Sequence, residues 1–108
     1  MRPLIDRYTY RVAYSPEDDE FMGLCVEFHS LSWLADSPEA ALKGIRQVID
    51  QTVKDMQVEG CEVPVPLIDR EYSGRFQVRM PPELHRRLAL VAAEQSVSLN
   101  RLVVSRLQ

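Results

Sequence analysis

The stretch "GRFQVRMPPEL" at residues 74–84 decides how the C-terminal part of the chain folds. Polar and apolar side chains alternate from Arg75 to Met80, which is the pattern of a β-strand with one exposed and one buried face. Two prolines then end the strand. No second strand-like run follows before the last residue, and a lone strand is not stable in water. The strand therefore needs a partner from outside this segment.

The residues after the strand predict two helices. The first follows Pro81-Pro82-Glu83 and places apolar residues on one face, namely Leu84, Leu88, Val91 and Ala92. The stretch "QSVSLN" at 95–100 interrupts it, and Ser98 can cap a second, short helix. The apolar stripe of this second helix consists of Leu99, Leu102, Val103 and Leu107. The predicted order of the C-terminal segment is strand, helix, helix.

The segment from residue 75 to residue 108 is short. Below roughly 40 residues a domain usually needs metal, disulfides or oligomerisation to be stable. Cys25 and Cys61 are far apart and have no CxxC spacing, so neither a disulfide framework nor a metal site is expected. Oligomerisation remains. Two strands that pair antiparallel about a two-fold axis would bury a dimer core over four helices. The predicted core residues are Phe76, Val78 and Met80.

The outer face of such a ribbon would carry Arg75, Gln77 and Arg79 from each copy. A two-stranded ribbon fits the major groove of DNA, where arginine can bond guanine and glutamine can bond adenine, so these residues are candidate base readers. The start of the second helix offers free N–H groups to a DNA phosphate. The residues there are Ser98, Leu99 and Asn100. A polar face is also ordinary for any half-buried antiparallel strand. The surrounding order of elements favours the DNA-binding interpretation, and it resembles the ribbon-helix-helix module.

The charge divides along the chain in the same way. Residues 1–74 carry seven basic and fourteen acidic residues, a net charge of −7, whereas residues 75–108 carry six arginines and two glutamates, a net charge of +4. The basic part favours a polyanion as its partner, and the acidic part favours a basic protein or solubility alone. The composition, 45% hydrophobic and 27% charged, is that of a soluble globular protein. No apolar run approaches the roughly 18 residues of a membrane span, so a cytoplasmic protein is expected.

The N-terminal part predicts a small antiparallel sheet with one covering helix. Strand-like runs occupy residues 8–14, 21–28 and 31–35, and the turn between the first two contains four consecutive acids. A helix is expected from Ser37-Pro38 up to Gly60, because apolar residues recur there at three- and four-residue spacing. The expected fold class is α+β, with a first domain over residues 1–69 and the ribbon-helix-helix domain over residues 70–108.

The whole chain resembles a HicB-type antitoxin of a bacterial type II toxin–antitoxin system. The resemblance rests on "YTYRVAYSPEDDEFMGLCVEFHSLSWLADSPEAALKGI" at 8–45 and "YSGRFQVRMPPELHRRLALVAAEQSVSLNRL" at 72–102. It implies an N-terminal domain that binds and neutralises a small, mRNA-cleaving HicA-type toxin. It also implies a C-terminal domain that represses the shared operon by binding operator DNA through Arg75, Gln77 and Arg79, in a homodimer or tetramer.

Two features of the acidic part are candidate toxin contacts. The run Glu17, Asp18, Asp19 and Glu20 could face a basic toxin, although a charged hairpin turn is usually only solvated. Trp33 could be an interface anchor or a core residue. An alternative function is a stand-alone ribbon-helix-helix regulator whose N-terminal domain senses a ligand or oligomerises. No enzyme and no cofactor are expected, because neither histidine has the spacing of a triad or metal site and the chain has no glycine-rich phosphate loop.

Overall fold

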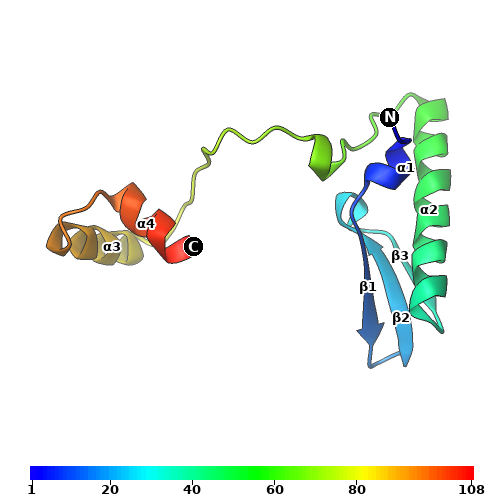
Figure 1. The fold of residues 1–108 in the computed structure, drawn as a ribbon, viewed down its shortest axis with the longest axis horizontal. Helices are drawn as coiled ribbons and strands as arrows, with labels where there is room; N and C mark the ends of the chain where they lie inside the picture. The colour runs from blue at the N-terminus through cyan, green and yellow to red at the C-terminus, as the bar shows by residue number, and fades with distance from the viewer. The chain divides into compact units, whose positions relative to one another are not determined.

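The computed structural model describes all 108 residues, and the chain divides into two compact units, Met1–Tyr72 and Ser73–Gln108 (Figure 1). The class is α+β, as the sequence predicts. The order of helices differs from the prediction, because a short helix precedes the first strand and two 3₁₀ turns were not expected. The elements are α1 (Leu4–Arg7), β1 (Tyr10–Ser15), β2 (Glu20–Cys25), η1 (Val26–Phe28), β3 (Ser32–Ala35), α2 (Pro38–Glu59), η2 (Leu67–Asp69), α3 (Pro82–Glu94) and α4 (Leu99–Leu107). No helix combines the length and the apolar character that a membrane crossing requires.

The first unit contains one antiparallel sheet in the order β1-β2-β3, with α2 packed on one face (Figure 1). The predicted three-stranded antiparallel sheet is thus confirmed. In the β1–β2 hairpin Tyr14 lies opposite Phe21, and their rings meet edge to face at a centroid distance of 5.6 Å. Asp19 closes the turn with a left-handed backbone, φ 50°. Short polar residues such as aspartate adopt this conformation more readily than most, which fits its place in the turn.

Helix α2 begins and ends where the sequence predicts. The Ser37 side chain accepts a hydrogen bond from the Ala40 N–H at 3.1 Å, and Pro38 occupies the first helical position. At the other end Gly60 has a left-handed backbone, φ 76°, and its N–H bonds the preceding turn of the helix. These signals are local, so they can be read from the sequence alone.

The core of the first unit lies between the sheet and α2. Tyr8 packs edge to face on Phe28 with ring centroids 5.2 Å apart, and its hydroxyl donates to the Pro64 carbonyl at 2.8 Å. The other buried members of this cluster are Cys25, Ile45, Ile49 and Val53. Burial raises the pKa of the Cys25 thiol to about 11, so this cysteine is an inert core residue.

Gly23 in β2 allows α2 to approach the sheet closely. A Cβ atom at this position would lie 2.4 Å from the Ala41 carbonyl oxygen and 2.9 Å from Ile45 Cγ2. Both distances are shorter than real Cβ contacts. The helix-to-sheet distance is therefore set by the absence of a side chain at Gly23.

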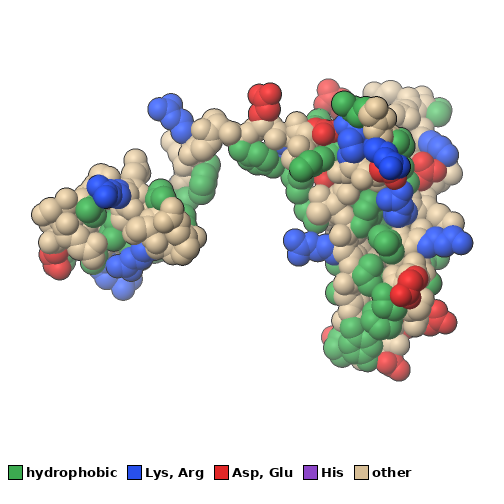
Figure 2. All heavy atoms as spheres, viewed as in Figure 1, with side chains coloured by type: hydrophobic (Ala, Val, Ile, Leu, Met, Phe, Trp, Pro, Cys, Tyr) green, Lys and Arg blue, Asp and Glu red, His purple; other side chains and the backbone are tan.

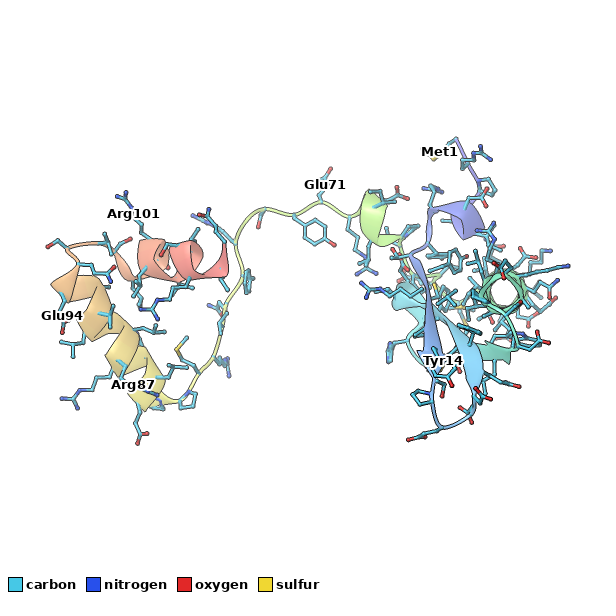
Figure 3. All side chains as sticks on the ribbon, turned by 60° about the horizontal axis from the view of Figure 1, so that its bottom comes forward. Met1, Tyr14, Glu71, Arg87, Glu94 and Arg101 are labelled. Carbon is cyan, nitrogen blue, oxygen red and sulfur yellow. The ribbon has the colours of Figure 1, made fainter.

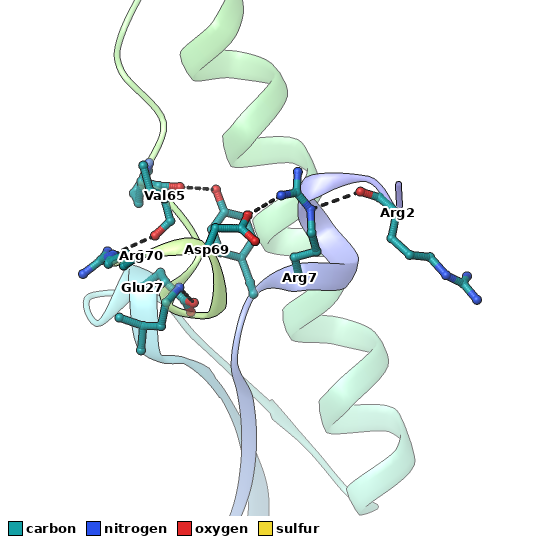
Figure 4. Close-up of polar contacts among 9 residues, drawn as sticks. Arg2, Arg7, Glu27, Val65, Asp69 and Arg70 are labelled. Atoms are coloured by element: carbon teal, nitrogen blue, oxygen red, sulfur yellow. Dashed lines mark hydrogen bonds and ion pairs between the residues drawn. The ribbon is translucent and has the colours of Figure 1, made fainter. Parts of the chain in front are cut away.

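A single carboxylate, Glu27, ties together three separate segments at the end of the sheet. It accepts hydrogen bonds from the Thr9 N–H at 2.9 Å, from the Thr9 hydroxyl at 3.2 Å and from the Leu67 N–H at 2.9 Å. Beside it an ion pair joins Arg7 to Asp69 (Figure 4). Together these contacts hold the η2 turn against the start of β1.

Replacing Glu27 by glutamine is expected to lower the free energy of unfolding by about 1–3 kcal/mol at neutral pH, since a charged acceptor of several hydrogen bonds is lost. Burial raises the pKa of the Glu27 carboxyl, but the hydrogen bonds from Leu67 and Thr9 outweigh burial and the net pKa is lowered from 4.5. A lowered folded-state pKa gives stability that is complete above the ordinary value and is lost as the pH falls through the folded-state value.

The difference between wild type and variant should therefore be largest near neutral pH and shrink as the pH falls below 4.5. Urea titrations followed by the fluorescence of Trp33, the single tryptophan, measure it at each pH. A difference that does not change with pH would contradict the assigned role of the carboxylate.

The second unit consists of α3 and α4 joined by a tight turn. Pro82 occupies the start of α3, and Ser98 caps α4 by accepting a hydrogen bond from the Arg101 N–H at 3.1 Å. In the turn between them the Val97 N–H bonds the Ala92 carbonyl at 3.0 Å, and Ser96 has a left-handed backbone. Both predicted helices are present, and the predicted cap at Ser98 is confirmed.

Residues 75–80 form no strand in the single chain. The strand of the predicted ribbon is therefore not confirmed, because the only sheet is β1-β2-β3 and nothing within the chain pairs with this segment. The sequence predicts the partner strand in a second chain. The strand itself stays a prediction about an assembly of chains.

Candidate nucleic-acid interface

An apolar groove of about 660 Å³ lies in the second unit between residues 74–80 and helix α4. The three predicted dimer-core residues, Phe76, Val78 and Met80, all line it. Helix α4 contributes apolar side chains to the opposite wall, namely Leu99, Val103, Val104 and Leu107. The segment that the sequence assigns to pairing thus stands next to the apolar face of the last helix.

This groove is poorly covered within the chain. Phe76 is 81% exposed and Val78 is 63% exposed, whereas only Ala92 and Leu102 in the whole unit are buried. A compact unit with two buried side chains has very little core of its own. Covering the groove with another apolar surface would supply the missing burial, at roughly 25 cal/mol for each Å² removed from water.

The predicted base-reading residues are all exposed. Arg75 and Arg79 lie at the rim of the groove, and Gln77 lies outside it. The Arg75 N–H bonds the Ser73 hydroxyl at 3.1 Å, just after Gly74, whose φ is 83°. The single chain therefore brings the two arginines to one groove but does not place all three side chains on one flat face.

The N-terminus of α4 has free backbone donors, as expected of a helix start. The Ser98 hydroxyl accepts a hydrogen bond from the Arg101 N–H, and the Ser98 carbonyl accepts one from the Leu102 N–H at 3.0 Å. The N–H groups of Leu99 and Asn100 have no helical partner, because the first donors of any helix lack one. The positive end of the helix dipole adds to their attraction for an anion.

The arginines of the second unit are unpaired. The four ion pairs of the chain all belong to the first unit, so the positive charges of the second unit are free to contact phosphates. Arg87 and Arg101 extend from α3 and α4 in Figure 3. The arginines are Arg75, Arg79, Arg86, Arg87, Arg101 and Arg106.

The acidic run of the first unit forms the β1–β2 turn. Asp18 accepts a hydrogen bond from the Ser15 hydroxyl at 2.9 Å, and Asp19 accepts one from the Tyr14 hydroxyl at 2.8 Å. The hydrogen bond with Asp19 raises the pKa of Tyr14. Glu17 and Glu20 make no side-chain hydrogen bond, so two of the four acids shape the turn and two are available to a partner.

Trp33 is neither fully buried nor free. The residue is 45% exposed, but its ring lies against α2 at Gly44, where a Cβ atom would come within 2.0 Å of Trp33 Cδ1. The ring therefore needs a glycine beneath it. One face of the indole packs on the helix, and the remainder is open to solvent.

Sequence reasoning missed Glu27, Gly23 and Gly44. A glycine inside a run of strand-forming residues is a recognised sign of close backbone approach, and this signal was present at Gly23. Nothing local to Glu27 points to its partners, because Thr9 and Leu67 are distant in sequence. Only the folded chain brings them together.

Comparison with known protein families gives a match to part of the chain. Residues 57–107 match the HicB family model, a range that contains the end of α2, the predicted ribbon strand and both C-terminal helices. The match supports a HicB-type protein. It does not extend to residues 8–45, where the resemblance stays a prediction. No curated protein and no solved structure is similar enough to the chain to count as a match.

Proposed function

We propose that this protein is an antitoxin that neutralises a HicA-type, mRNA-cleaving toxin and represses its own operon as a dimer bound to operator DNA. The observation that carries the proposal is the exposed apolar groove of the second unit, within the range that matches the HicB family. The groove contains every residue assigned to the dimer core, and the chain leaves it uncovered.

The DNA-binding half of the proposal rests on charge and on position. Pairing two copies of residues 75–80 turns Phe76 and Val78 inward, and the period of a strand then turns Arg75, Gln77 and Arg79 outward. The unpaired arginines and the free N–H groups at the start of α4 would anchor the ribbon to flanking phosphates. The ribbon supplies the sequence reading, and the phosphate contacts supply its position on the duplex.

Replacing Gln77 by alanine is expected to reduce discrimination between operator and scrambled DNA, and Arg79→Ala is expected to weaken operator binding. Each lost base contact costs about 1–3 kcal/mol, and a dimer loses two. The measurement is a gel-shift titration on the DNA just upstream of the start codon, at several salt concentrations. Arg87→Ala is the matched control, because it removes one positive charge from α3 outside the ribbon.

The control should weaken binding to operator and scrambled DNA by the same factor and should lower the salt dependence. Operator binding that is unchanged in both Gln77→Ala and Arg79→Ala would remove the ribbon as the reading surface. The dimer should persist in both variants, since neither residue belongs to the proposed dimer core.

The toxin-binding half rests on the acidity of the first unit. A ribonuclease must attract RNA, so its active face should be basic, and a unit with a net charge of −7 can compete for that face. Glu17 and Glu20 are the two acids of the hairpin turn that make no side-chain hydrogen bond within the chain. Co-purification with the product of a small adjacent reading frame, compared between wild type and a Glu17→Gln, Glu20→Gln variant, tests this contact.

A further inference from the structure

The outer edge of β1 is a strand edge with nothing paired to it. The sheet order is β1-β2-β3, so one side of β1 has no neighbouring strand. The strand contains no proline, and its central residues, Arg11 to Tyr14, are exposed. Natural proteins usually protect such an edge with prolines, bulges or several charges, because it offers a row of unpaired backbone groups. Here Arg11 is the single charged residue within the strand.

The register shows which backbone groups face the open edge. The Thr9 carbonyl accepts from the Val26 N–H at 2.9 Å, so Thr9 directs its backbone toward β2. Hydrogen bonding alternates along an antiparallel strand, and Arg11 and Ala13 therefore also bond β2. The N–H and C=O groups of the residues between them point outward. These residues are Tyr10, Val12 and Tyr14.

The same residues leave an apolar strip beside the edge. Val12 lies opposite Gly23, which faces α2, so its side chain shares that face. Helix α2 lies mainly over β2 and β3, and Val12 remains 37% exposed and Tyr14 52% exposed. Leu42 on α2 is 40% exposed, and hydrophobic side chains gather in the region of β1 and α2 in Figure 2. A strand added here would gain both backbone hydrogen bonds and apolar contacts.

We propose that β1 pairs antiparallel with β1 of a second copy, about a two-fold axis through Val12, to join two sheets into one. The strand is self-complementary in this register, because Val12 lies opposite Val12 of the second copy and Tyr10 lies opposite Tyr14 of the second copy. In this register Arg11, which makes no ion pair in the chain, lies opposite Ala13 of the second copy, on the face of the strand away from α2.

This interface is separate from the C-terminal ribbon, so the two can be tested independently in the full chain. The background variant is Phe76→Asp, which removes the proposed C-terminal pairing. In this background the chain is expected to remain a dimer in sedimentation velocity at about 100 μM, well above the micromolar dissociation constant of a weak specific interface. Adding Val12→Lys should raise the dissociation constant at least about tenfold, because two like charges then face each other across the axis.

A charge exchange makes the test specific to a two-fold axis at residue 12. Val12→Glu alone should dissociate the dimer as Val12→Lys does, and an equimolar mixture of the two variants should restore it. Leu34→Lys is the matched control, because it adds the same charge to an exposed residue of β3, the strand at the opposite edge of the sheet from β1. This control should remain dimeric, and circular dichroism checks that each variant is folded.

If the Phe76→Asp protein is folded but monomeric at about 100 μM, the proposal is overturned, whether or not the wild type binds operator DNA. Failure of the Lys and Glu variants to pair when mixed would overturn the two-fold register. If Val12→Lys abolishes only the binding of a basic partner protein, the occupant of the edge is that partner and not a second copy. Persistence of the dimer in Phe76→Asp, with DNA binding unaffected, would instead remove the ribbon of the proposed function and leave this interface standing.

Discussion

Replacing Phe76 by aspartate is expected to abolish operator binding while the unit Met1–Tyr72 stays folded. Phe76 is 81% exposed in the single chain, so the substitution disturbs little packing within it. In the proposed ribbon the same side chain is buried against its copy, and an unpaired carboxylate there is strongly unfavourable. A lone chain would keep only half of the base contacts. At about 1–3 kcal/mol for each of three lost contacts, affinity should fall by more than about 100-fold.

Gel shifts on operator DNA measure the loss of affinity. Unchanged Trp33 fluorescence and an unchanged urea midpoint would show that the unit Met1–Tyr72 is still folded. Leu90→Asp is the matched control, since Leu90 is exposed on α3 and does not line the groove, yet the same charge is added to the same unit. The control should lose only the small electrostatic part of the affinity. In the Val12→Lys background Phe76→Asp should give a monomer. Operator binding equal to that of the Leu90→Asp control would contradict the pairing of residues 75–80.

The parts of the fold that the sequence predicts are those with local causes. Ser37 and Ser98 cap helices through their own next turn, and Gly60 ends α2 because it can adopt a left-handed backbone. The apolar spacing of α2 likewise reports the face that it buries. These features depend on residues within one or two helical turns, which a single sequence displays directly.

The parts that the sequence did not predict depend on side-chain contacts that have no regular spacing along the chain. Helix α1 is only four residues long, and it is held by the Tyr10 hydroxyl, which donates to the Ile5 carbonyl at 2.6 Å, and by an ion pair between Arg46 and Asp6. Neither contact leaves a local pattern. The predicted ribbon strand is likewise not present in the single chain, where no strand pairs with residues 75–80.

At the candidate site, the structure brings together the predicted apolar residues but not the predicted polar ones. Phe76, Val78 and Met80 gather in one groove, as their shared apolar character predicts. The outward alternation of Arg75, Gln77 and Arg79 is absent in the single chain, because strand geometry requires a ladder to enforce it. The apolar pattern is thus informative without a partner, whereas the polar pattern acquires its meaning only in the paired state.

Replacing Gly23 by alanine is expected to lower the free energy of unfolding of the first unit by about 1–3 kcal/mol, the usual cost of overpacking a close-packed interior. The added Cβ would lie 2.4 Å from the Ala41 carbonyl oxygen, which is helix backbone and cannot turn aside as a flexible side chain could. Helix α2 would have to move away from the sheet as a body. Gly60→Ala is the control, since a Cβ there meets nothing within 4 Å and only the left-handed backbone opposes it.

Urea titrations of both variants, followed by Trp33 fluorescence, measure the two losses of stability. They compare the cost of overpacking at Gly23 with the cost of a left-handed backbone at Gly60. The Gly23 variant should also change the emission of Trp33, because a shifted α2 moves the ring, which rests on Gly44 of that helix. Operator binding should survive in both variants, since the second unit shares no core with the first. If Gly23→Ala were no less stable than Gly60→Ala, the close approach of α2 to β2 would not be a constraint on the fold, and the glycine would need another explanation.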